Sequence, residues 1–303
     1  MDKSIRPHIA LLACNVIWAL DYPFYKIVMP QYISPLAMAT SAVVIAALLS
    51  LATLPFSPWE KVEKKDIPKL LGAALLITAL RKIFLMEGVA HTSPVDGSVI
   101  GTLIPIFVLI LSVIIGIDKF TPKRIIGVLF AAGGAAAVIL MGTSSSHPAS
   151  TLYGNLFVLL CVFFTAFYMV WVKKLLAKYK TMTVLRWIYC AGALMMLPFG
   201  APAIVHTDYA AFTHPVLWAY LFVLLLPTFL PNLLQAYGLK YVKPMVSSMY
   251  AYVGPIIATA VSLWMGQDKL HWDTVLAAMA IFFGIYLVIR SYRPPIPAIH
   301  MDH

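Results

Sequence analysis

Two stretches of this sequence share the same spaced residues 150 positions apart: PVDGSVIGTLIPIFVLILSVIIGIDKF at 94–120 and PMVSSMYAYVGPIIATAVSLWMGQDKL at 244–270. Each stretch begins with a proline, has a second proline eleven residues later, and ends near a Gly-x-Asp-Lys sequence. An offset of 147 applies near the start of each half, where three residues match: Cys14, Ala19 and Lys26 with Cys161, Ala166 and Lys173. We therefore divide the chain into two similar halves, residues 1–145 and 146–303.

The composition excludes an ordinary soluble protein. Of 303 residues, 61% are hydrophobic and 11% are charged, and the mean hydropathy is +0.88. Soluble domains carry roughly 45–50% apolar and about 25% charged residues. We therefore predict an all-α integral membrane protein in a lipid bilayer. Its net charge of +10 is typical of basic cytoplasmic loops, so we expect no nucleic-acid partner.

Apolar runs of about 20 residues, the length that crosses a bilayer as a helix, predict ten transmembrane helices. They lie at 8–29, 34–54, 67–88, 94–116, 122–141, 152–173, 183–204, 215–238, 244–265 and 273–291. With cytoplasmic N- and C-termini, sixteen of the 22 Lys and Arg residues fall on the inner side and one on the outer side. This asymmetry favours that orientation, which we assign to a bacterial inner membrane. Because each half has five helices, the second half must be inverted relative to the first, an architecture that recurs in secondary transporters.

The duplicated motif also resembles that of the EamA-like family in the drug/metabolite transporter superfamily. The resemblance rests on the two proline pairs and on Gly116-Ile117-Asp118 and Gly266-Gln267-Asp268, and it covers nearly the whole chain. The family most often has Glu where this chain has Asp. The resemblance implies ten helices in two inverted-topology five-helix repeats around a central cavity. It also implies an exporter or exchanger of small metabolites.

The first predicted helix offers candidate substrate-binding residues. Charged groups within a membrane are costly, by about 2.5–3.5 kcal/mol on insertion scales, so they are functional candidates by default. Asp21 is such a group and a candidate for proton coupling. Pro23 removes a backbone hydrogen bond and should bend the helix. The aromatic candidates beside it are Trp18, Tyr22 and Tyr25.

The third predicted helix carries Arg81, Lys82 and Glu87. Adjacent helical residues point about 100° apart, so we expect one of the two cations to bind substrate and the other either to be paired or to snorkel to the membrane surface. The offset of 150 places uncharged residues at the equivalent positions of the second half. Such asymmetry is expected of a substrate site. Glu87 is a second candidate for proton coupling.

The second half offers three uncharged candidates for substrate binding, Tyr168, Asn232 and Tyr250. Asn232 follows Pro227 and Pro231, which predict a kinked or broken helix. A structural alternative for Asn232 is a hydrogen bond between helices.

Other motifs favour structural roles. Asp118 and Asp268 lie at predicted helix ends, where a carboxylate accepts backbone hydrogen bonds. The glycines and alanines of 131–137 favour close helix packing, with dimerisation as the alternative, so the chain could be a monomer or a homodimer. No Cys/His cluster has metal-ligand spacing, and we expect neither a metal nor a cofactor.

The function we predict is secondary transport of small metabolites, an amino acid or another zwitterionic or anionic solute. We expect an exporter that works by alternating access with proton coupling or exchange. The alternative is a broad-specificity exporter of lipophilic toxic compounds. The sequence has no nucleotide-binding motif for ATP-driven transport and no hydrolase motif that would favour a membrane enzyme. A channel would need a pore filter, which the sequence does not suggest.

Overall fold

The structure is a computed structural model that describes residues 5–116, 119, 121–141, 151–267, 269 and 271–290. These residues form helices and connecting turns, without any β-strand among them. The first half contains α1 (Ile5–Ala19), α2 (Asp21–Val28), α3 (Pro35–Ala52), the short η1 (Lys64–Asp66), α4 (Ile67–Ala74), the π-helix η2 (Leu75–Leu80), α5 (Arg81–Ala90), α6 (Pro94–Gly101), α7 (Ile104–Ile114) and α8 (Pro122–Met141). The second half contains α9 (Leu152–Lys178), α10 (Thr181–Val205), η3 (Tyr209–Ala211), α11 (His214–Tyr241), α12 (Pro244–Ser248), η4 (Met249–Tyr252), α13 (Val253–Trp264) and α14 (Trp272–Arg290).

Seven helical segments within the described residues are long and apolar enough to cross a membrane. They are Ile5–Val28, Pro35–Ala52, Pro94–Ile114, Leu152–Lys178, Thr181–Val205, His214–Tyr241 and Pro244–Trp264. The predicted spans at 67–88, 122–141 and 273–291 also overlap helices, although they are not among these seven. The predicted all-helical membrane architecture is confirmed, whereas the number of crossings stays a prediction.

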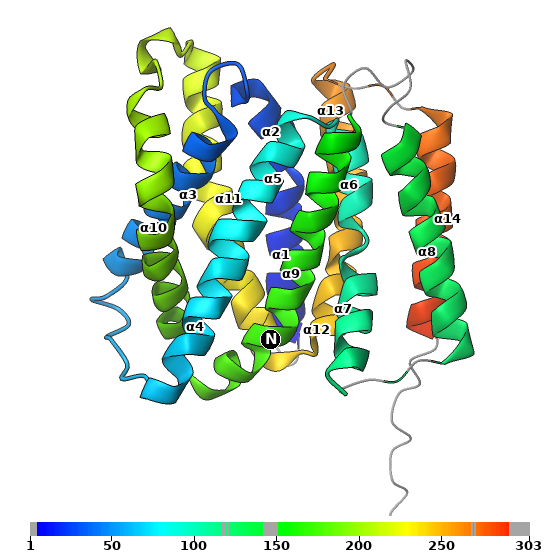
Figure 1. Cartoon of the computed structure of the whole chain (residues 1–303), viewed down its shortest axis with the longest axis horizontal. Coiled ribbons are helices and arrows are strands. Elements are labelled where there is room, and N and C mark those ends of the chain that lie inside the picture. Colours follow the sequence, from blue (N-terminus) through cyan, green and yellow to red (C-terminus); the bar gives the residue numbers. More distant parts are fainter. Residues whose placement is uncertain are drawn as a thin grey trace, which may run out of the picture.

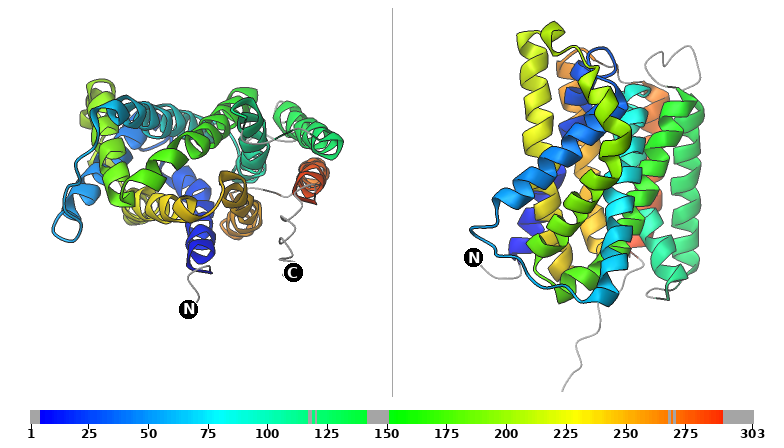
Figure 2. Two further views of the ribbon diagram at one scale, coloured as in Figure 1. Left: turned by 90° about the horizontal axis from the view of Figure 1, so that it is seen from below. Right: turned by 60° about the vertical axis from the view of Figure 1, so that its left-hand side comes forward.

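The helices stand side by side in one bundle, with α8 and α14 as a pair at one edge (Figure 1, Figure 2). The start of α1, the segment between α3 and α4, and the C-terminal ends of α9 and α11 lie at the same end of the bundle (Figure 1). We call this end the lysine-rich face. It carries Lys61, Lys64, Lys65, Lys174, Lys178, Lys180, Lys240 and Lys243.

The first helix is interrupted as the sequence predicts. Helix α1 ends at Ala19 and α2 begins at Asp21, after a turn at Leu20. Pro23 has no N–H to donate to the Ala19 carbonyl, so the helical hydrogen-bond ladder loses one bond at this turn. The break places Asp21 at the start of a new helix.

Of the two alternatives predicted for this segment, a kinked or a broken helix, the structure shows no break, because α11 is continuous through Pro227 and Pro231. Two side chains satisfy the carbonyls that these prolines leave without a helical partner. The Thr228 hydroxyl donates to the Val223 carbonyl at 2.7 Å, and the Trp18 indole N–H donates to the Pro227 carbonyl at 3.3 Å. The second bond links the two halves of the chain.

The glycines of the duplicated motif end two helices. Gly116 follows α7 with a φ of 79°, and Gly266 follows α13 with a φ of 68°. A residue with a side chain is strained in this left-handed conformation, which commonly terminates helices at glycine. Asp118 and Asp268 lie outside the described residues.

Two lysines that match in the sequence repeat make similar contacts. The Lys26 ammonium donates to the Ala90 carbonyl at 3.2 Å, at the end of α5. The Lys173 ammonium donates to the carbonyls at the end of α11, including those of Lys240 at 3.0 Å and Val242 at 2.8 Å. A cation stabilises a helix C-terminus because the last carbonyls lack helical partners.

Adjacent glycines in α8 provide a matched test of helix packing. A Cβ added at Gly134 would lie 2.6 Å from the Ala277 carbonyl oxygen on α14, whereas one added at Gly133 would meet nothing within 4 Å. We expect Gly134→Leu to destabilise the protein by about 1–3 kcal/mol, the usual cost of overpacking. At ~2–4 °C per kcal/mol, its melting temperature in detergent should fall by roughly 3–10 °C.

The control is Gly133→Leu, which makes the same chemical change on the exposed side of the helix. Its melting temperature should stay within about 2 °C of the unchanged protein, as for most surface substitutions. Equal shifts for the two variants would show that α8 and α14 do not pack through Gly134. Thermal unfolding followed by tryptophan fluorescence measures both.

Candidate substrate-binding site

A cavity with about 820 Å3 of empty space, including its opening, lies between the two halves of the chain. The charged and aromatic residues that line it are Asp21, Arg81, Trp18, Tyr22 and Tyr25. The remaining lining residues are Asn15, Ala19, Leu85, Val89, Ser98, Gly101, Ile104, Cys161, Val162, Thr165, Met169, Gln235, Ser247, Ser248, Ala251 and Gly254. The walls are therefore mainly apolar, with a few polar groups, as is typical of small-molecule sites.

Most of this lining comes from equivalent positions of the two halves. At the offset of 150, four pairs line the cavity together: Leu85 and Gln235, Ser98 and Ser248, Gly101 and Ala251, Ile104 and Gly254. At the offset of 147, three more pairs do so: Asn15 and Val162, Trp18 and Thr165, Tyr22 and Met169. The charged residues Asp21 and Arg81 are outside this matched set.

A π-helix precedes the two cations of the third predicted span. Segment η2 (Leu75–Leu80) interrupts the α-helical register immediately before Arg81 and Lys82. A π-turn inserts extra backbone and is frequent at functional sites. Within η2, the Thr78 side chain packs against α10 at Gly192, where a Cβ would overlap the Thr78 hydroxyl. The backbone of α10 therefore approaches η2 closely at this glycine.

Arg81 presents its guanidinium to the cavity. Its Nε donates to the Thr165 hydroxyl at 3.0 Å, and its guanidinium carbon lies 5.4 Å from the centre of the Trp18 ring. Among the described residues, no carboxylate lies within ion-pair distance of Arg81. Its terminal nitrogens can therefore bind an anion in the cavity.

Lys82 is not among the residues that line the main cavity. Only 6% of Lys82 is exposed, and its ammonium donates to the Tyr25 hydroxyl at 3.0 Å. A smaller cavity of about 270 Å3 lies beside the main one, and both Arg81 and Lys82 line it. Its other lining residues are Val43, Ile77, Thr78, Tyr189, Thr228 and Asn232.

Asp21 is the one carboxylate among the residues that line either cavity. It is 5% exposed, and its Oδ1 atom is buried without a hydrogen-bond partner. The positive charges of Lys82 and Arg81 interact electrostatically with the Asp21 carboxylate. An acceptor in this position is costly to leave unsatisfied unless nearby charges or a bound proton compensate.

The comparisons with known proteins point to one family. The model of the EamA-like transporter family matches residues 5–140 and 152–290. The chain belongs to the EamA-like transporter family. The resemblance drawn from the duplicated motif is thereby confirmed. Family membership and the apolar helices make the chain a multi-pass membrane protein.

The relatives of this EamA-like protein are transporters by name. An "Uncharacterized transporter" of Archaeoglobus fulgidus is 24% identical over 95% of this chain and 100% of its own length. "Uncharacterized transporter YetK" of Bacillus subtilis is 25% identical over 97% of this chain and 90% of its own. A "Probable terminal-alkyne amino-acid exporter" of Streptantibioticus cattleyicolor is 23% identical over 93% of this chain and 92% of its own length. A solved crystal structure matches 95% of this chain and 99% of its own chain with a TM-score of 0.67 and 14% sequence identity. This likeness shows the fold alone.

Three predicted site residues of this EamA-like chain lie outside both cavity linings. Tyr168 is buried within the bundle, at 3% exposure. The Tyr250 hydroxyl lies 2.7 Å from His8 Nδ1, and the Glu87 carboxylate lies 4.0 Å from the His91 ring. Asn232 lines the smaller cavity, where its amide donates to the Thr228 carbonyl at 2.7 Å. The other predicted residues, Trp18, Asp21, Tyr22, Tyr25 and Arg81, line the main cavity.

The predicted site omitted several polar lining residues, among them Asn15, Ser98 and Thr165. The repeat offset supplied a signal for two of them. Ser98 matches Ser248, and Thr165 is the counterpart of Trp18. Residues at equivalent positions of two similar halves are expected to face the same central space.

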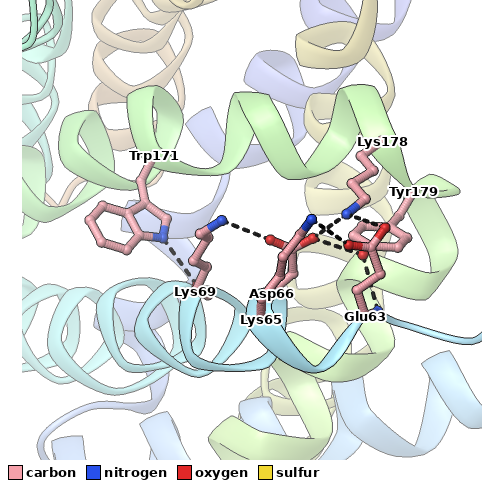
Figure 3. A network of polar contacts seen from close by, with 7 residues as sticks. All are labelled: Glu63, Lys65, Asp66, Lys69, Trp171, Lys178 and Tyr179. Atoms are coloured by element: carbon pink, nitrogen blue, oxygen red, sulfur yellow. Dashed lines mark hydrogen bonds and ion pairs between the residues drawn. The ribbon is translucent and has the colours of Figure 1, made fainter.

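A polar network at the lysine-rich face of the EamA-like fold joins the start of α4 to the end of α9 (Figure 3). The Asp66 carboxylate accepts hydrogen bonds from Lys178 at 2.6 Å, from Lys69 at 2.7 Å and from the Tyr179 hydroxyl at 2.8 Å. Glu63 also pairs with Lys178, at 2.6 Å. The network thus connects the helix that carries Arg81 to the second half of the chain.

Replacing Asp66 with asparagine should lower the melting temperature at neutral pH. The hydrogen bonds from Lys178, Lys69 and Tyr179 hold the pKa of the Asp66 carboxyl well below its usual range. The stabilisation is therefore present above the ordinary carboxyl pKa of about 3.9 and is lost as pH falls through the lower pKa of the folded state. The difference in melting temperature between the unchanged protein and Asp66→Asn should stay constant from pH 8 to about 5 and shrink below about 4.

Lys65→Gln serves as the control for this variant, because the Lys65 side chain is 73% exposed and contacts Glu63. Exposed ion pairs contribute about 0–1 kcal/mol, so its melting temperature should change little. If the difference in melting temperature between the unchanged protein and Asp66→Asn already shrinks between pH 8 and 6, the pKa of Asp66 is not lowered.

Proposed function

We propose that this EamA-like protein is a secondary transporter that exports a small organic metabolite, an amino acid or another zwitterionic or anionic solute. The observation that carries the proposal is the Arg81 guanidinium, which faces a central cavity with no carboxylate at ion-pair distance among the described residues. A cation in such a site suits the carboxylate of a metabolite. The exporter named among the relatives supports the outward direction. The chain would act in a bacterial inner membrane with both termini in the cytoplasm.

The mechanism we propose is alternating access by two inverted five-helix halves that together cross the membrane ten times. The seven equivalent residue pairs in the cavity lining support it, as do Gly116 with Gly266 and Lys26 with Lys173. Two similar halves in opposite orientation can exchange conformations and so open the same site to either side.

Asp21 is the proton-coupling residue in this proposal. It lines the main cavity, and its buried Oδ1 has no hydrogen-bond partner, whereas Glu87 lies outside both cavities. A carboxylate next to the substrate-binding Arg81 can take up a proton on one side of the membrane and release it on the other as the site changes its access. The driving force would then be the proton gradient.

The experiment is efflux from proteoliposomes that contain the purified protein and a mixed metabolite panel, with and without an imposed pH gradient, read by mass spectrometry. We expect saturable loss of one chemical class, accelerated by the gradient. Saturable loss of lipophilic cations and neutral toxic compounds would instead support the broad-specificity alternative. No saturable loss of any compound would refute the proposed function.

The same assay separates the two coupling candidates. Asp21→Asn should retain exchange of substrate across the membrane but lose the response to the pH gradient. Glu87→Gln should keep that response. The opposite pattern would assign coupling to Glu87.

A further inference from the structure

The charges around the main cavity do not balance. Arg81 lines the main cavity, Lys82 lines the smaller cavity that Arg81 also reaches, and Asp21 is the one carboxylate among the lining residues. With all three groups ionised, the site carries one excess positive charge. Uncompensated charge is costly once the site closes and water leaves.

The excess charge is located at Arg81. The Lys82 ammonium is buried and donates to the hydroxyl of Tyr25, which lies one helical turn after Asp21 on α2. Arg81 uses only its Nε for a hydrogen bond to Thr165 in the described part of the chain. The two terminal nitrogens of a guanidinium form a planar fork that matches a carboxylate.

We infer that the transported solute is an organic monoanion, an amphipathic carboxylate without an ammonium group, an inference that rests on the transport function proposed above. A monoanion bound at Arg81 neutralises the site. A zwitterion has no net charge and would leave the excess charge in place. Its ammonium would also have to compete with the Lys82 ammonium for electrostatic interaction with Asp21. A cation would add to the excess charge.

The apolar residues of the lining indicate what kind of group the anion carries beside its carboxylate. Leu85, Val162 and Met169 give an apolar wall, and Trp18 and Tyr22 add aromatic faces. This wall suits a branched aliphatic or aromatic side chain, because burying apolar area is favourable.

Neutral polar groups complete the lining. They belong to Asn15, Ser98, Gln235 and Ser248. Hydroxyl and amide groups suit a hydroxyl or keto oxygen on the solute, because they can donate or accept a hydrogen bond. An α-hydroxy acid with an apolar side chain therefore combines the features that the cavity can bind.

The experiment compares ligands that share one carbon skeleton and differ in charge. The probes are leucine, the α-hydroxy acid of the leucine skeleton, the amide of that hydroxy acid, and isopentylamine, with the phenylalanine series as a second set. Binding to the unchanged protein is followed by tryptophan fluorescence in detergent, and transport by counterflow in proteoliposomes. We expect the hydroxy acids to bind at least about tenfold more tightly than the amino acids, a difference of 1.4 kcal/mol. The amides and amines should neither bind nor exchange.

The outcomes separate this inference from the proposed function. Saturable counterflow of the amino acids or amines, with equal or weaker binding of the hydroxy acids, would overturn the monoanion and leave a transporter in place. Absence of saturable flux for every probe and for the mixed panel would overturn both. Arg81→Gln should bring the affinity for hydroxy acid and amide to the same level, and Lys65→Gln should leave the preference unchanged.

Discussion

Arg81→Gln is expected to weaken substrate binding by about 10- to 100-fold. A hydrogen bond to a charged group contributes about 1.5–3 kcal/mol, and each 1.4 kcal/mol is a factor of ten in affinity. Glutamine retains a polar side chain but supplies neither the charge nor the guanidinium fork. The initial rate of efflux, measured against substrate concentration in proteoliposomes, should show the loss mainly as a higher KM.

Two further variants make this result specific to the guanidinium. Arg81→Lys keeps the charge but presents a point donor instead of a planar fork, so its KM should lie between those of the unchanged protein and Arg81→Gln. Lys65→Gln removes an exposed cation from the segment before α4 and should leave KM unchanged. An unchanged KM for a folded Arg81→Gln protein would show that Arg81 does not contact the substrate.

Much of the helical layout follows from local sequence. The predicted span 183–204 lies within α10, Thr181–Val205, because a mainly apolar run of this length matches one helix that crosses a bilayer. Gly116 and Gly266 end their helices for a local reason too, since glycine adopts positive φ without strain. The unbroken α11 could not be predicted in this way. Its prolines are compensated by Thr228 and by Trp18, which is 209 residues away from the carbonyl it contacts.

The candidate site was predictable where charge or aromaticity identifies a residue. Asp21, Arg81 and Trp18 have side chains that are unusual within a membrane, and they line the cavity. Neutral residues such as Thr165 carry no such signal, although the repeat offset relates it to Trp18. The π-helix η2 contacts α10 at Gly192 through Thr78, and local sequence does not reveal such a tertiary contact.

The network at Asp66 was not predicted, again because it depends on distant segments. A single acidic residue among lysines is typical of a solvated loop, and such charges usually contribute little. In the structure, Asp66 meets Lys178 and Tyr179 from the second half, more than 110 residues away. Only the packing of α4 against α9 brings these groups together.

Lys82→Met is expected to destabilise the protein by about 3–5 kcal/mol, because it removes a buried cation whose charge offsets that of the buried Asp21. The residue left behind is Asp21, which is 5% exposed. At ~2–4 °C per kcal/mol, the melting temperature should fall by roughly 10 °C. Adding Asp21→Asn to Lys82→Met removes the remaining charge and should recover a large part of this loss. A double-mutant cycle on thermal unfolding in detergent measures the coupling, which we expect to be about 1–3 kcal/mol.

Lys173→Met is the matched control for this cycle. Lys173 is also a lysine within a helix of the bundle, but it contacts the carbonyls at the end of α11 instead of facing a carboxylate. The effect of Asp21→Asn on stability should therefore simply add to that of Lys173→Met, and the double variant should regain none of the stability that Lys173→Met loses. If the losses in the Asp21 and Lys82 cycle also simply add, the two groups do not interact as charges. Asp21 would then already hold a proton in the resting protein, and the negative charge that we assign to it beside the cavity would be absent.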